Sequence, residues 1–419
     1  MRELEDRFRS LDRVEAPDLW NEAVTRAAEL GGTRRRPVSR AFVLVAAALL
    51  LALLAGAIVV GARLIRPAPD LSSLRYANGL IVSSGACGQV IAVDPNSSQT
   101  RELAPGSPGC TEGEYLPVET AWSSDGRLLA YGVWRSCGGC LDQSEPAGAW
   151  VYDVASGASL RIGECPEHAC KEIDISADGS LVTYYAESQR NGQDTLVVVE
   201  VDSGRSHQIA LPGEADSPSF SPDGSRILLP MLGGTSGLYV VDTSRVASDA
   251  AEPTFIYGMV EAINAVWSPD GEWIAFDQAS ADGYGIWVVR ADGSEPKMLS
   301  IGPALEAPGH PTWSPDSRSI AYVRTPGESD GATTLELSTV GLDGDESSRI
   351  YASGCCIFDW SAPAWSPDGE YISFGVGVAD RPAVSGTAYI RPDGTDLHWV
   401  TADFLRPDWQ PVPIPSAAE

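Results

Sequence analysis

Two short segments hold the residues whose types and spacing most readily suggest chemistry. Cys137-Gly-Gly-Cys140 is followed by Cys165-Pro-Glu-His168-Ala-Cys170, which together supply four thiols and an imidazole. Thiolates and imidazoles at such short spacings are common ligands of tetrahedral zinc. One hypothesis is therefore a zinc site formed by Cys137, Cys140, Cys165 and Cys170. No other metal site and no cofactor is expected from the sequence.

The alternative for the same residues is oxidation to disulfides. All eight cysteines follow the long apolar segment at residues 41–62: Cys87, Cys110, Cys137, Cys140, Cys165, Cys170, Cys355 and Cys356. This distribution is typical of a chain whose C-terminal part lies in an oxidising compartment, where disulfides persist. Pairing of sequence neighbours would join 87 to 110, 137 to 140, 165 to 170 and 355 to 356. Eight cysteines allow about 105 pairings, so other connectivities stay open.

Motifs that are typical of catalysis are missing from the sequence. It has four histidines, but no Gly-x-Ser-x-Gly elbow, no phosphate-binding loop and no pair of carboxylates placed by a motif. We therefore expect a binding protein and not an enzyme.

A repeated motif predicts the elements that carry these residues. Six segments align without gaps, beginning at Ala121, Asp174, Ser219, Val266, Thr312 and Ala364. The fullest form reads Trp-Ser-Pro-Asp-Gly-x-x-Ile-Ala-Phe, and the motif recurs about every 50 residues, as propeller blades do. Pro fixes φ and Gly permits positive φ, so Ser-Pro-Asp-Gly predicts a tight turn between two strands. A second hairpin follows in each repeat, which makes four strands, or one blade.

The two ends of the chain supply a further blade. Arg406-Pro-Asp-Trp409 matches the start of a seventh motif, and residues 79–103 supply three more strands without a first. Joining them predicts an all-β, seven-bladed β-propeller over residues 79–419, with six blades as the alternative if the ends do not pair. Closure would remove the exposed strand edges that invite aggregation. The recurrent aromatic residue of the motif is expected to pack between neighbouring sheets: Trp122, Phe220, Trp267, Trp313 and Trp365.

The W-S-P-D-G-x-x-I-A-F pattern resembles the TolB-type, WD40-like propeller repeat of bacterial envelope proteins. This resemblance covers about 340 residues and implies the propeller fold. It implies less about function, because the repeat occurs in translocation proteins, peptidases and sensors.

The two faces of such a propeller are expected to differ. The turns between first and second strands and between third and fourth strands lie on one face, which we call the turn face. The other connections lie on the opposite face, which we call the loop face, and all eight cysteines map there. Long loops on a rigid scaffold commonly bind ligands. We therefore expect a protein or a small polar ligand to bind the loop face.

A second candidate site lies at the mouth of the central channel, which first strands line. Three positions before the aromatic residue, six of the seven repeats carry a polar residue: Glu119, Glu172, Ser217, Asn264, His310 and Arg406, with Ala362 as the exception. This ring could bind a small polar ligand or a cation. It could equally line a channel that holds only water.

Residues 41–62 predict a single membrane span. They are uncharged and mostly Ala, Leu, Val and Gly, and as a helix they would measure about 33 Å. Four arginines lie just before this segment (34, 35, 36 and 40) and two after it (63 and 66), so the N-terminus is expected in the cytoplasm. The chain would then be a single-pass protein of the bacterial cell membrane, with a linker at residues 63–78 and an extracytoplasmic propeller. A cleaved export signal is the rival interpretation.

Charge excludes one class of partner. The chain has a net charge of −28, and the part after Arg66 is more acidic still, because the N-terminal segment holds 11 of the 29 basic residues. Such a surface repels phosphate backbones, so no nucleic acid is expected to bind.

Residues 1–40 predict a cytoplasmic tail of two short amphipathic helices. Leu4, Phe8 and Leu11 share one helical face, and a similar pattern follows Pro17. A helical tail, one span and an outer domain resemble the layout of transmembrane anti-sigma factors, although the zinc-binding His and Cys of that family are absent from residues 1–40. Two functions stay open. The propeller could be a sensor that relays a signal to a cytoplasmic regulator, or an envelope scaffold for protein interactions without signalling.

Overall fold

The computed structural model describes fifteen stretches of the chain: residues 75–84, 89–104, 119–133, 148–164, 170–186, 195–248, 250–258, 261–281, 283–302, 308–324, 336–344, 348–352, 362–376, 386–402 and 405–414. All of them belong to one compact unit, Asp70–Glu419. Within these stretches no helix is both long and apolar enough to cross a bilayer. The predicted tail at residues 1–40 and the predicted span at residues 41–62 lie outside them.

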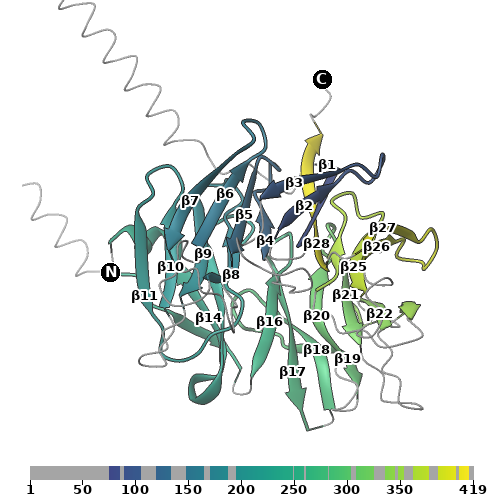
Figure 1. Cartoon of the computed structure of the whole chain (residues 1–419). Coiled ribbons are helices and arrows are strands. Elements are labelled where there is room, and N and C mark those ends of the chain that lie inside the picture. The colour runs from purple at the N-terminus through teal and green to yellow at the C-terminus, as the bar shows by residue number, and fades with distance from the viewer. Residues whose placement is uncertain are drawn as a thin grey trace, which may run out of the picture. The chain divides into compact units, whose positions relative to one another are not determined.

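The described residues form seven four-stranded antiparallel sheets, which we number as blades from the N-terminus (Figure 1). Blade 1 consists of β28 (Leu405–Ile414), β1 (Arg75–Ser84), β2 (Val90–Val93) and β3 (Thr100–Ala104). Blade 2 consists of β4 (Thr120–Trp122), β5 (Leu128–Val133), β6 (Gly148–Asp153) and β7 (Ala158–Glu164). Blade 3 consists of β8 (Cys170–Ile175), β9 (Leu181–Ala186), β10 (Thr195–Glu200) and β11 (Ser206–Ala210).

The remaining blades follow in chain order. Blade 4 consists of β12 (Ser219–Phe220), β13 (Arg226–Met231), β14 (Gly237–Asp242) and β15 (Thr254–Tyr257), with short 3-10 helices η2 (Gly233–Thr235) and η3 (Thr243–Ser248). Blade 5 consists of β16 (Ala262–Trp267), β17 (Trp273–Ser280), β18 (Gly283–Arg290) and β19 (Lys297–Gly302). Blade 6 consists of β20 (Pro308–Trp313), β21 (Ser319–Arg324), β22 (Glu336–Gly341) and β23 (Ser348–Ala352). Blade 7 consists of β24 (Ala364–Trp365), β25 (Ile372–Val376), β26 (Gly386–Ile390) and β27 (His398–Ala402).

The first strands of the seven motifs form a closed inner ring. Each contacts the first strand of the next blade in the cycle β4, β8, β12, β16, β20, β24, β28 and back to β4. Because every first strand has two such neighbours, the sheets surround a central channel as the blades of a propeller do. The predicted seven-bladed all-β propeller is thereby confirmed.

Pairing between the two ends of the propeller closes the ring. β28 pairs with β1 from Leu405 opposite Ser84 to Ile414 opposite Arg75, so that the last described strand lies beside the first (Figure 1). Strand β1 therefore begins at Arg75 and includes residues 75–78, which the sequence had suggested as linker. The reason is the length of β28, whose residues 411–414 pair with residues 75–78 of β1.

The Ser-x-Asp-Gly turns share one hydrogen-bond pattern. In blade 5, the Ser268 hydroxyl donates to Oδ1 of Asp270 at 2.6 Å and accepts the backbone N–H of Trp273 at 2.9 Å. Asp270 Oδ1 also accepts the backbone N–H of Glu272 at 3.0 Å, and Gly271 adopts the left-handed φ of 72° that the turn requires. The Ser-to-Asp bond recurs in five further blades, at Ser123, Ser176, Ser221, Ser314 and Ser366.

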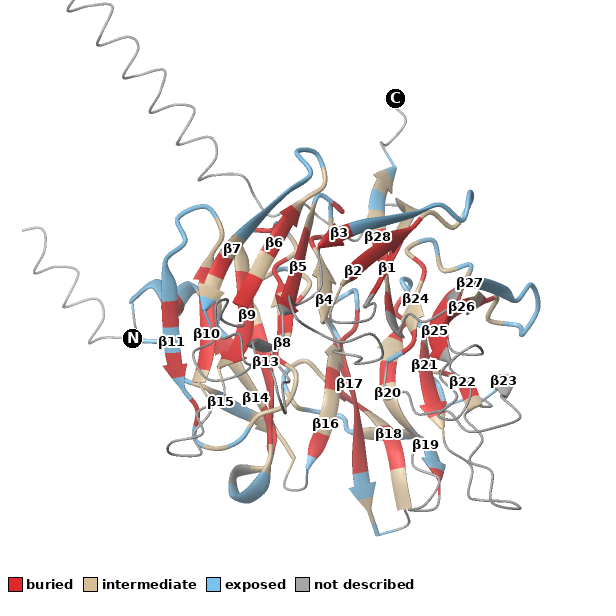
Figure 2. Cartoon of the chain, in the orientation of Figure 1, coloured by how far each residue is buried: buried red, intermediate tan, exposed pale blue. Residues whose placement is uncertain are grey.

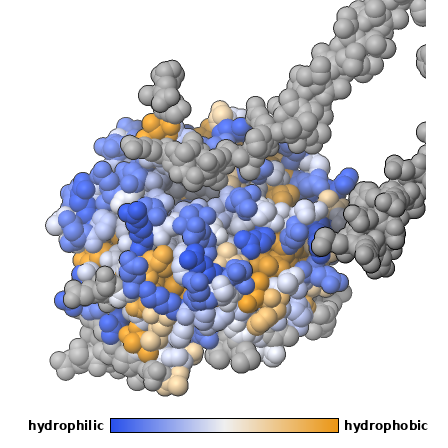
Figure 3. Space-filling view, turned by 180° about the vertical axis from the view of Figure 1, so that it is seen from behind, coloured by the Kyte–Doolittle hydropathy of each residue, from blue (hydrophilic) through white to orange (hydrophobic). Residues whose placement is uncertain are grey.

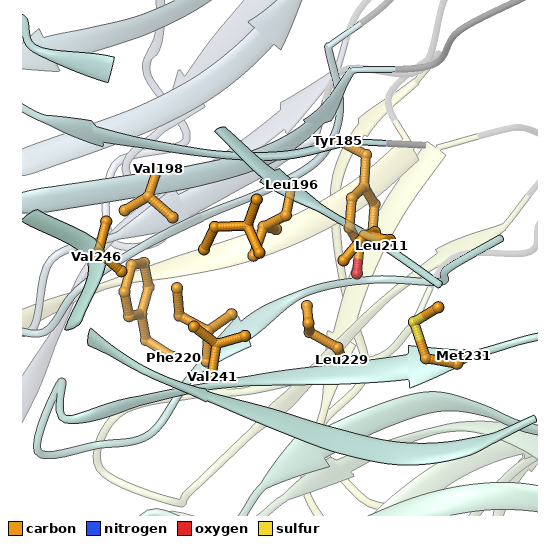
Figure 4. Close-up of a cluster of buried hydrophobic side chains, with 11 residues drawn as sticks. Tyr185, Leu196, Val198, Leu211, Phe220, Leu229, Met231, Val241 and Val246 are labelled. Carbon is orange, nitrogen blue, oxygen red and sulfur yellow. The ribbon is translucent and has the colours of Figure 1, made fainter. Parts of the chain in front are cut away.

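The hydrophobic core lies between neighbouring blades. One cluster joins Tyr185, Leu196 and Val198 of blade 3 to Phe220, Leu229 and Val241 of blade 4 (Figure 4). The buried residues run along the middle of the strands, while turns and many outer-strand residues are exposed (Figure 2). Each blade is thus covered on its flat faces by its neighbours, which is why a single blade could not be stable alone.

The recurrent aromatic residues pack where the sequence predicted. The indole nitrogen of Trp267 donates to the carbonyl of Ser219 in the preceding blade, and that of Trp313 donates to the carbonyl of Val266, each at 3.3 Å. Trp267, Trp313 and Phe220 are all buried. Their role between the sheets is therefore structural.

Replacing one turn serine tests how much the turn pattern stabilises the fold. Ser268 is fully buried and satisfies two polar groups, so Ser268→Ala should lower the free energy of unfolding by about 1 to 2 kcal/mol. Ser294 is exposed and makes a similar bond to Asp292 in a turn between third and fourth strands, so Ser294→Ala should cost less than about 0.5 kcal/mol. Urea unfolding followed by tryptophan fluorescence measures both, and equal losses would contradict this ranking.

Candidate functional site

The cysteine sites predicted from the sequence lie almost entirely outside the described residues. This applies to Cys87, Cys110, Cys137, Cys140, Cys165, Cys355 and Cys356, and Cys170 is described only through its backbone in β8. The zinc hypothesis and the disulfide pairings therefore stay predictions. Within the residues that the structure does describe, no group of three or more His, Cys, Asp or Glu is placed to hold a metal ion.

The predicted ring residues lie at the start of the inner strands, and three of them have an unusual backbone. Glu172, Asn264 and His310 have left-handed φ values of 53°, 52° and 55°. Each lies in a β-bulge, where the pairing of β8, β16 or β20 with the second strand of its blade shifts register. A left-handed φ is uncommon for residues other than glycine, and bulges commonly redirect side chains near functional sites. The backbone is thus specialised at the mouth of the channel.

Hydrogen bonds connect several ring positions from blade to blade. The Ser217 hydroxyl of blade 4 donates to Oε2 of Glu172 in blade 3 at 2.6 Å. Its neighbour Asp216 accepts the backbone N–H of Asn264 in blade 5 at 2.7 Å. The Asn264 amide in turn donates to Oδ2 of Asp277 at 3.2 Å. The structure therefore brings Glu172, Ser217 and Asn264 into one network across three blades.

The other ring residues lie at the same end of the inner strands. Glu119 directly precedes β4 and is half-buried, and His310 lies in β20. Arg406 lies in β28, where only its backbone is described.

Two acidic residues deeper in the channel were not selected from the sequence. Asp174 in β8 and Asp408 in β28 stand directly before the aromatic position of their motifs, where the other repeats have Ala121, Ser219, Val266, Thr312 and Ala364. Asp174 accepts the backbone N–H groups of Phe220 at 2.7 Å and of Ile175 at 2.8 Å, so its carboxylate links blade 3 to blade 4. The signal was available: an acidic residue recurs twice at a position that is otherwise small or apolar.

Both carboxyl groups have strongly raised pKa values. Burial raises the pKa of Asp174 to about 7, although the two backbone N–H groups oppose the shift. Burial also raises the pKa of Asp408 to about 7, and the charge of Asp174 adds to that rise. Both residues keep intermediate exposure although protein surrounds their carboxyl groups, as expected for side chains that line a narrow channel. The two groups therefore lie close enough for like charges to repel each other.

Acidic residues occupy the inner position in two of the seven blades. These are Asp174 in blade 3 and Asp408 in blade 1, whereas the other blades have Ala121, Ser219, Val266, Thr312 and Ala364 there. A cation or a hydrogen-bond donor would relieve the repulsion between these acids. Figure 3 shows that the surface seen from behind is largely hydrophilic, with smaller hydrophobic areas between.

Comparison with known proteins supports the assignment of the repeat. A family model described as the TolB beta propeller domain matches residues 109–368, which is more than half of the chain. The Tol-Pal system protein TolB of Anaeromyxobacter dehalogenans is 32% identical over 127 residues, or 30% of this chain and 28% of that protein. The protein of the same name from Gluconobacter oxydans is 29% identical over 225 residues, or 43% of this chain and 48% of that protein. The matches thus span less than half the length of these relatives.

Solved structures show the same fold at low sequence identity. A functionally unknown protein from Desulfotomaculum acetoxidans is 12% identical, with a TM-score of 0.55 over 80% of this chain and 99% of that one. An oligogalacturonate lyase in complex with manganese is 15% identical, with a TM-score of 0.50 over 78% of this chain and 83% of that one. At these identities the likeness concerns the fold alone.

The pH dependence of stability tests the raised pKa of Asp408. Because its pKa is about 7 in the folded chain and about 3.8 in the unfolded chain, the folded state binds the proton more tightly between these values. Wild-type stability therefore falls, relative to Asp408→Asn, as the pH rises from about 4 to about 7, and the difference is constant above that window.

Asp242 provides the control for this measurement. Its pKa is lowered by hydrogen bonds from Ser244, so Asp242→Asn should show a difference that is constant over the same window. Urea unfolding at four or five pH values measures both variants. A constant difference for Asp408→Asn would show that this carboxyl group titrates normally.

Proposed function

This chain belongs to the TolB β-propeller domain family, and we propose that it is a membrane-anchored binding module of the bacterial envelope that acts as a scaffold for protein interactions. The propeller would lie outside the cytoplasmic membrane, and partners would bind its loop face and the adjoining mouth of the channel.

The observation that carries this proposal is the difference between the two ends of the channel. On the turn face, Ser-Asp hydrogen bonds hold the connections in one conformation in six blades. At the opposite end, the inner strands carry bulges, half-exposed polar side chains and a network that crosses three blades. A rigid scaffold with specialised polar groups at one end is typical of a binding surface.

A binding role is proposed and not an enzymatic one, because the sequence contains none of the common catalytic motifs. The raised pKa values of Asp174 and Asp408 could suit acid-base chemistry, but both groups are held against backbone N–H groups of the scaffold itself. The fold gives no guidance, since binding proteins and enzymes share it.

Anchoring in the membrane rests on the sequence of residues 41–62 and on the arginines that flank it. Export agrees with the distribution of cysteines, all of which follow that segment. The matching relatives are named as proteins of the Tol-Pal system, which agrees with a role among other proteins of the envelope.

A sensor that signals through the tail is the second candidate, and the apolar spacing in residues 1–40 favours it. A 40-residue segment with two amphipathic faces has little core of its own, so a protein partner or the membrane surface would have to cover these faces.

Site-specific crosslinking in living cells tests the binding face. A photoreactive residue at Glu214 or Glu261, both exposed beside the inner strands on the loop face, should give adducts with envelope proteins. The same residue at Asp202 or Asp343, which are exposed on the turn face, should give few. Adducts of equal yield from both faces, or from the turn face alone, would contradict the proposal.

Deleting residues 1–40 while keeping the span separates the scaffold from the sensor. The scaffold predicts unchanged crosslinks from the loop face and an unchanged transcript profile. A change of transcription with crosslinks intact would favour the sensor, and recovery of a soluble regulator with a purified 1–40 peptide would identify what the tail binds.

A further inference from the structure

A buried carboxylate beside the channel mouth has one oxygen that the protein does not satisfy. Asp277 of β17 is only 2% exposed. Its Oδ2 accepts hydrogen bonds from the Asn264 amide at 3.2 Å and from the Tyr284 hydroxyl at 3.0 Å. Its Oδ1 is buried and has no hydrogen-bond partner among the described residues. Buried polar atoms normally have partners, so this oxygen indicates a missing one.

Neither protonation state of Asp277 removes the need for that partner. An ionised carboxylate leaves Oδ1 as an acceptor without a donor. A carboxyl group protonated on Oδ1 would carry an O–H donor without an acceptor. Protonation on Oδ2 is disfavoured, because that oxygen already accepts two hydrogen bonds. Oδ1 therefore needs a partner that the described residues do not supply, and a donor fits the ionised form.

The surroundings of Asp277 favour a positively charged donor. Burial is the main cause that raises the pKa of Asp277 to about 7, and the charge of Asp216 adds to this rise. Burial is also the main cause that raises the pKa of the Tyr284 hydroxyl, and the charges of Asp277, Asp216 and Glu261 add to it. Three acidic side chains thus act on one small region. None of them forms a salt bridge with a basic residue in the described part of the chain.

Only the outer residues of this region reach the surface. Asp216, Asn264 and Tyr284 are half-exposed and Glu261 is exposed, while Asp277 is buried behind Asn264 and Tyr284. All of them lie near the ends of strands that border the loop face. Gly309 of blade 6 packs closely beside the carboxylate, since a Cβ on it would lie only 3.3 Å from Oδ2 of Asp277.

We propose that Asp277, Asp216, Asn264 and Tyr284, which we call the Asp277 site, bind the ammonium group of a lysine side chain on a protein partner. An ammonium group supplies the N–H donor that Oδ1 lacks and the positive charge that the three acids lack. A metal ion fits less well, because the described residues offer no group of three metal-binding side chains. This inference rests on the proposed binding role of the loop face and names the chemistry that the face recognises.

Binding of a blocked lysine to the full-length chain in detergent micelles tests the site. The probe is Nα-acetyl-lysine methylamide, and its counterpart carries a second acetyl group on the ε nitrogen. Ligand-observed NMR should give a Kd for the first probe that is at least about tenfold lower than for the second. Asp277→Asn should raise the Kd of the first probe at least about tenfold, because it removes the charge beneath the site.

Two further variants make the test decisive. Asp202→Asn removes one exposed negative charge from the turn face, at the opposite end of the blades, and it should leave the Kd unchanged within about twofold. Asp216→Asn alters a half-exposed residue, and it should weaken binding severalfold even if Asp277→Asn fails to fold, which circular dichroism would reveal.

Three results would overturn the inference. They are equal Kd values for the two probes, an unchanged Kd in both Asp277→Asn and Asp216→Asn, and calcium binding that displaces the lysine probe and is lost in Asp277→Asn. The last result would identify a metal site. Crosslinks from Glu214 and Glu261 that persist undiminished in Asp277→Asn would reject the Asp277 site and leave the proposed function standing.

Discussion

Closure of the ring is the constraint on which the rest of this structure depends. Every blade presents two apolar faces, and each face is covered only by the next blade, as the cluster between blades 3 and 4 illustrates. An open row of six or seven blades would leave two large apolar faces and an inner ring with two free ends. The pairing of β28 with β1 removes both at once, because it completes blade 1 between blades 7 and 2. Closure thus comes first. The hydrogen bonds of the turn serines and the packing of the tryptophans between blades add stability to a ring that is already closed.

The residues that stabilise the propeller and those proposed to bind partners lie at opposite ends of the inner strands. The Ser-x-Asp-Gly pattern repeats with little variation on one face, and even the exception in blade 6 conforms, since Ser317 takes the left-handed φ of the missing glycine. The Ser317 hydroxyl also accepts the backbone N–H of Asp270 in blade 5. At the other end of the same strands the residues differ from blade to blade, and bulges appear in blades 3, 5 and 6. The repeated hydrogen bonds on the turn face hold each blade in place, so the residues at the loop-face end of the inner strands can differ from blade to blade.

The fold could be predicted from the sequence because its signals are local and repeated. Ser-Pro-Asp-Gly specifies a turn by the φ preferences of two residues, and six copies specify the period. Closure could be predicted because residues 79–103 supply three strands without a first, and the C-terminal end supplies that first strand.

The ring at the channel mouth could be predicted as a set of positions, but the contacts of its residues could not. The bulges at Glu172, Asn264 and His310 place non-glycine residues at positive φ, which no local pattern indicates. Asp277 could not be selected, because a lone aspartate in a second strand becomes unusual only when its unpaired oxygen is seen.

Joining the two ends of the propeller has a consequence for how the protein is made. Arg75 and Ile414 pair although almost the entire propeller sequence separates them. A nascent chain can form the hairpins of blades 2 to 7 as they emerge, yet blade 1 stays incomplete until the final strand has been synthesised. Contacts between such distant segments form slowly, and the waiting intermediate exposes strand edges and apolar faces. A ribosome that stalls before codon 405 would therefore release a polypeptide with most of its blades and none of its closure, a species that proteolytic quality control would recognise by those open edges.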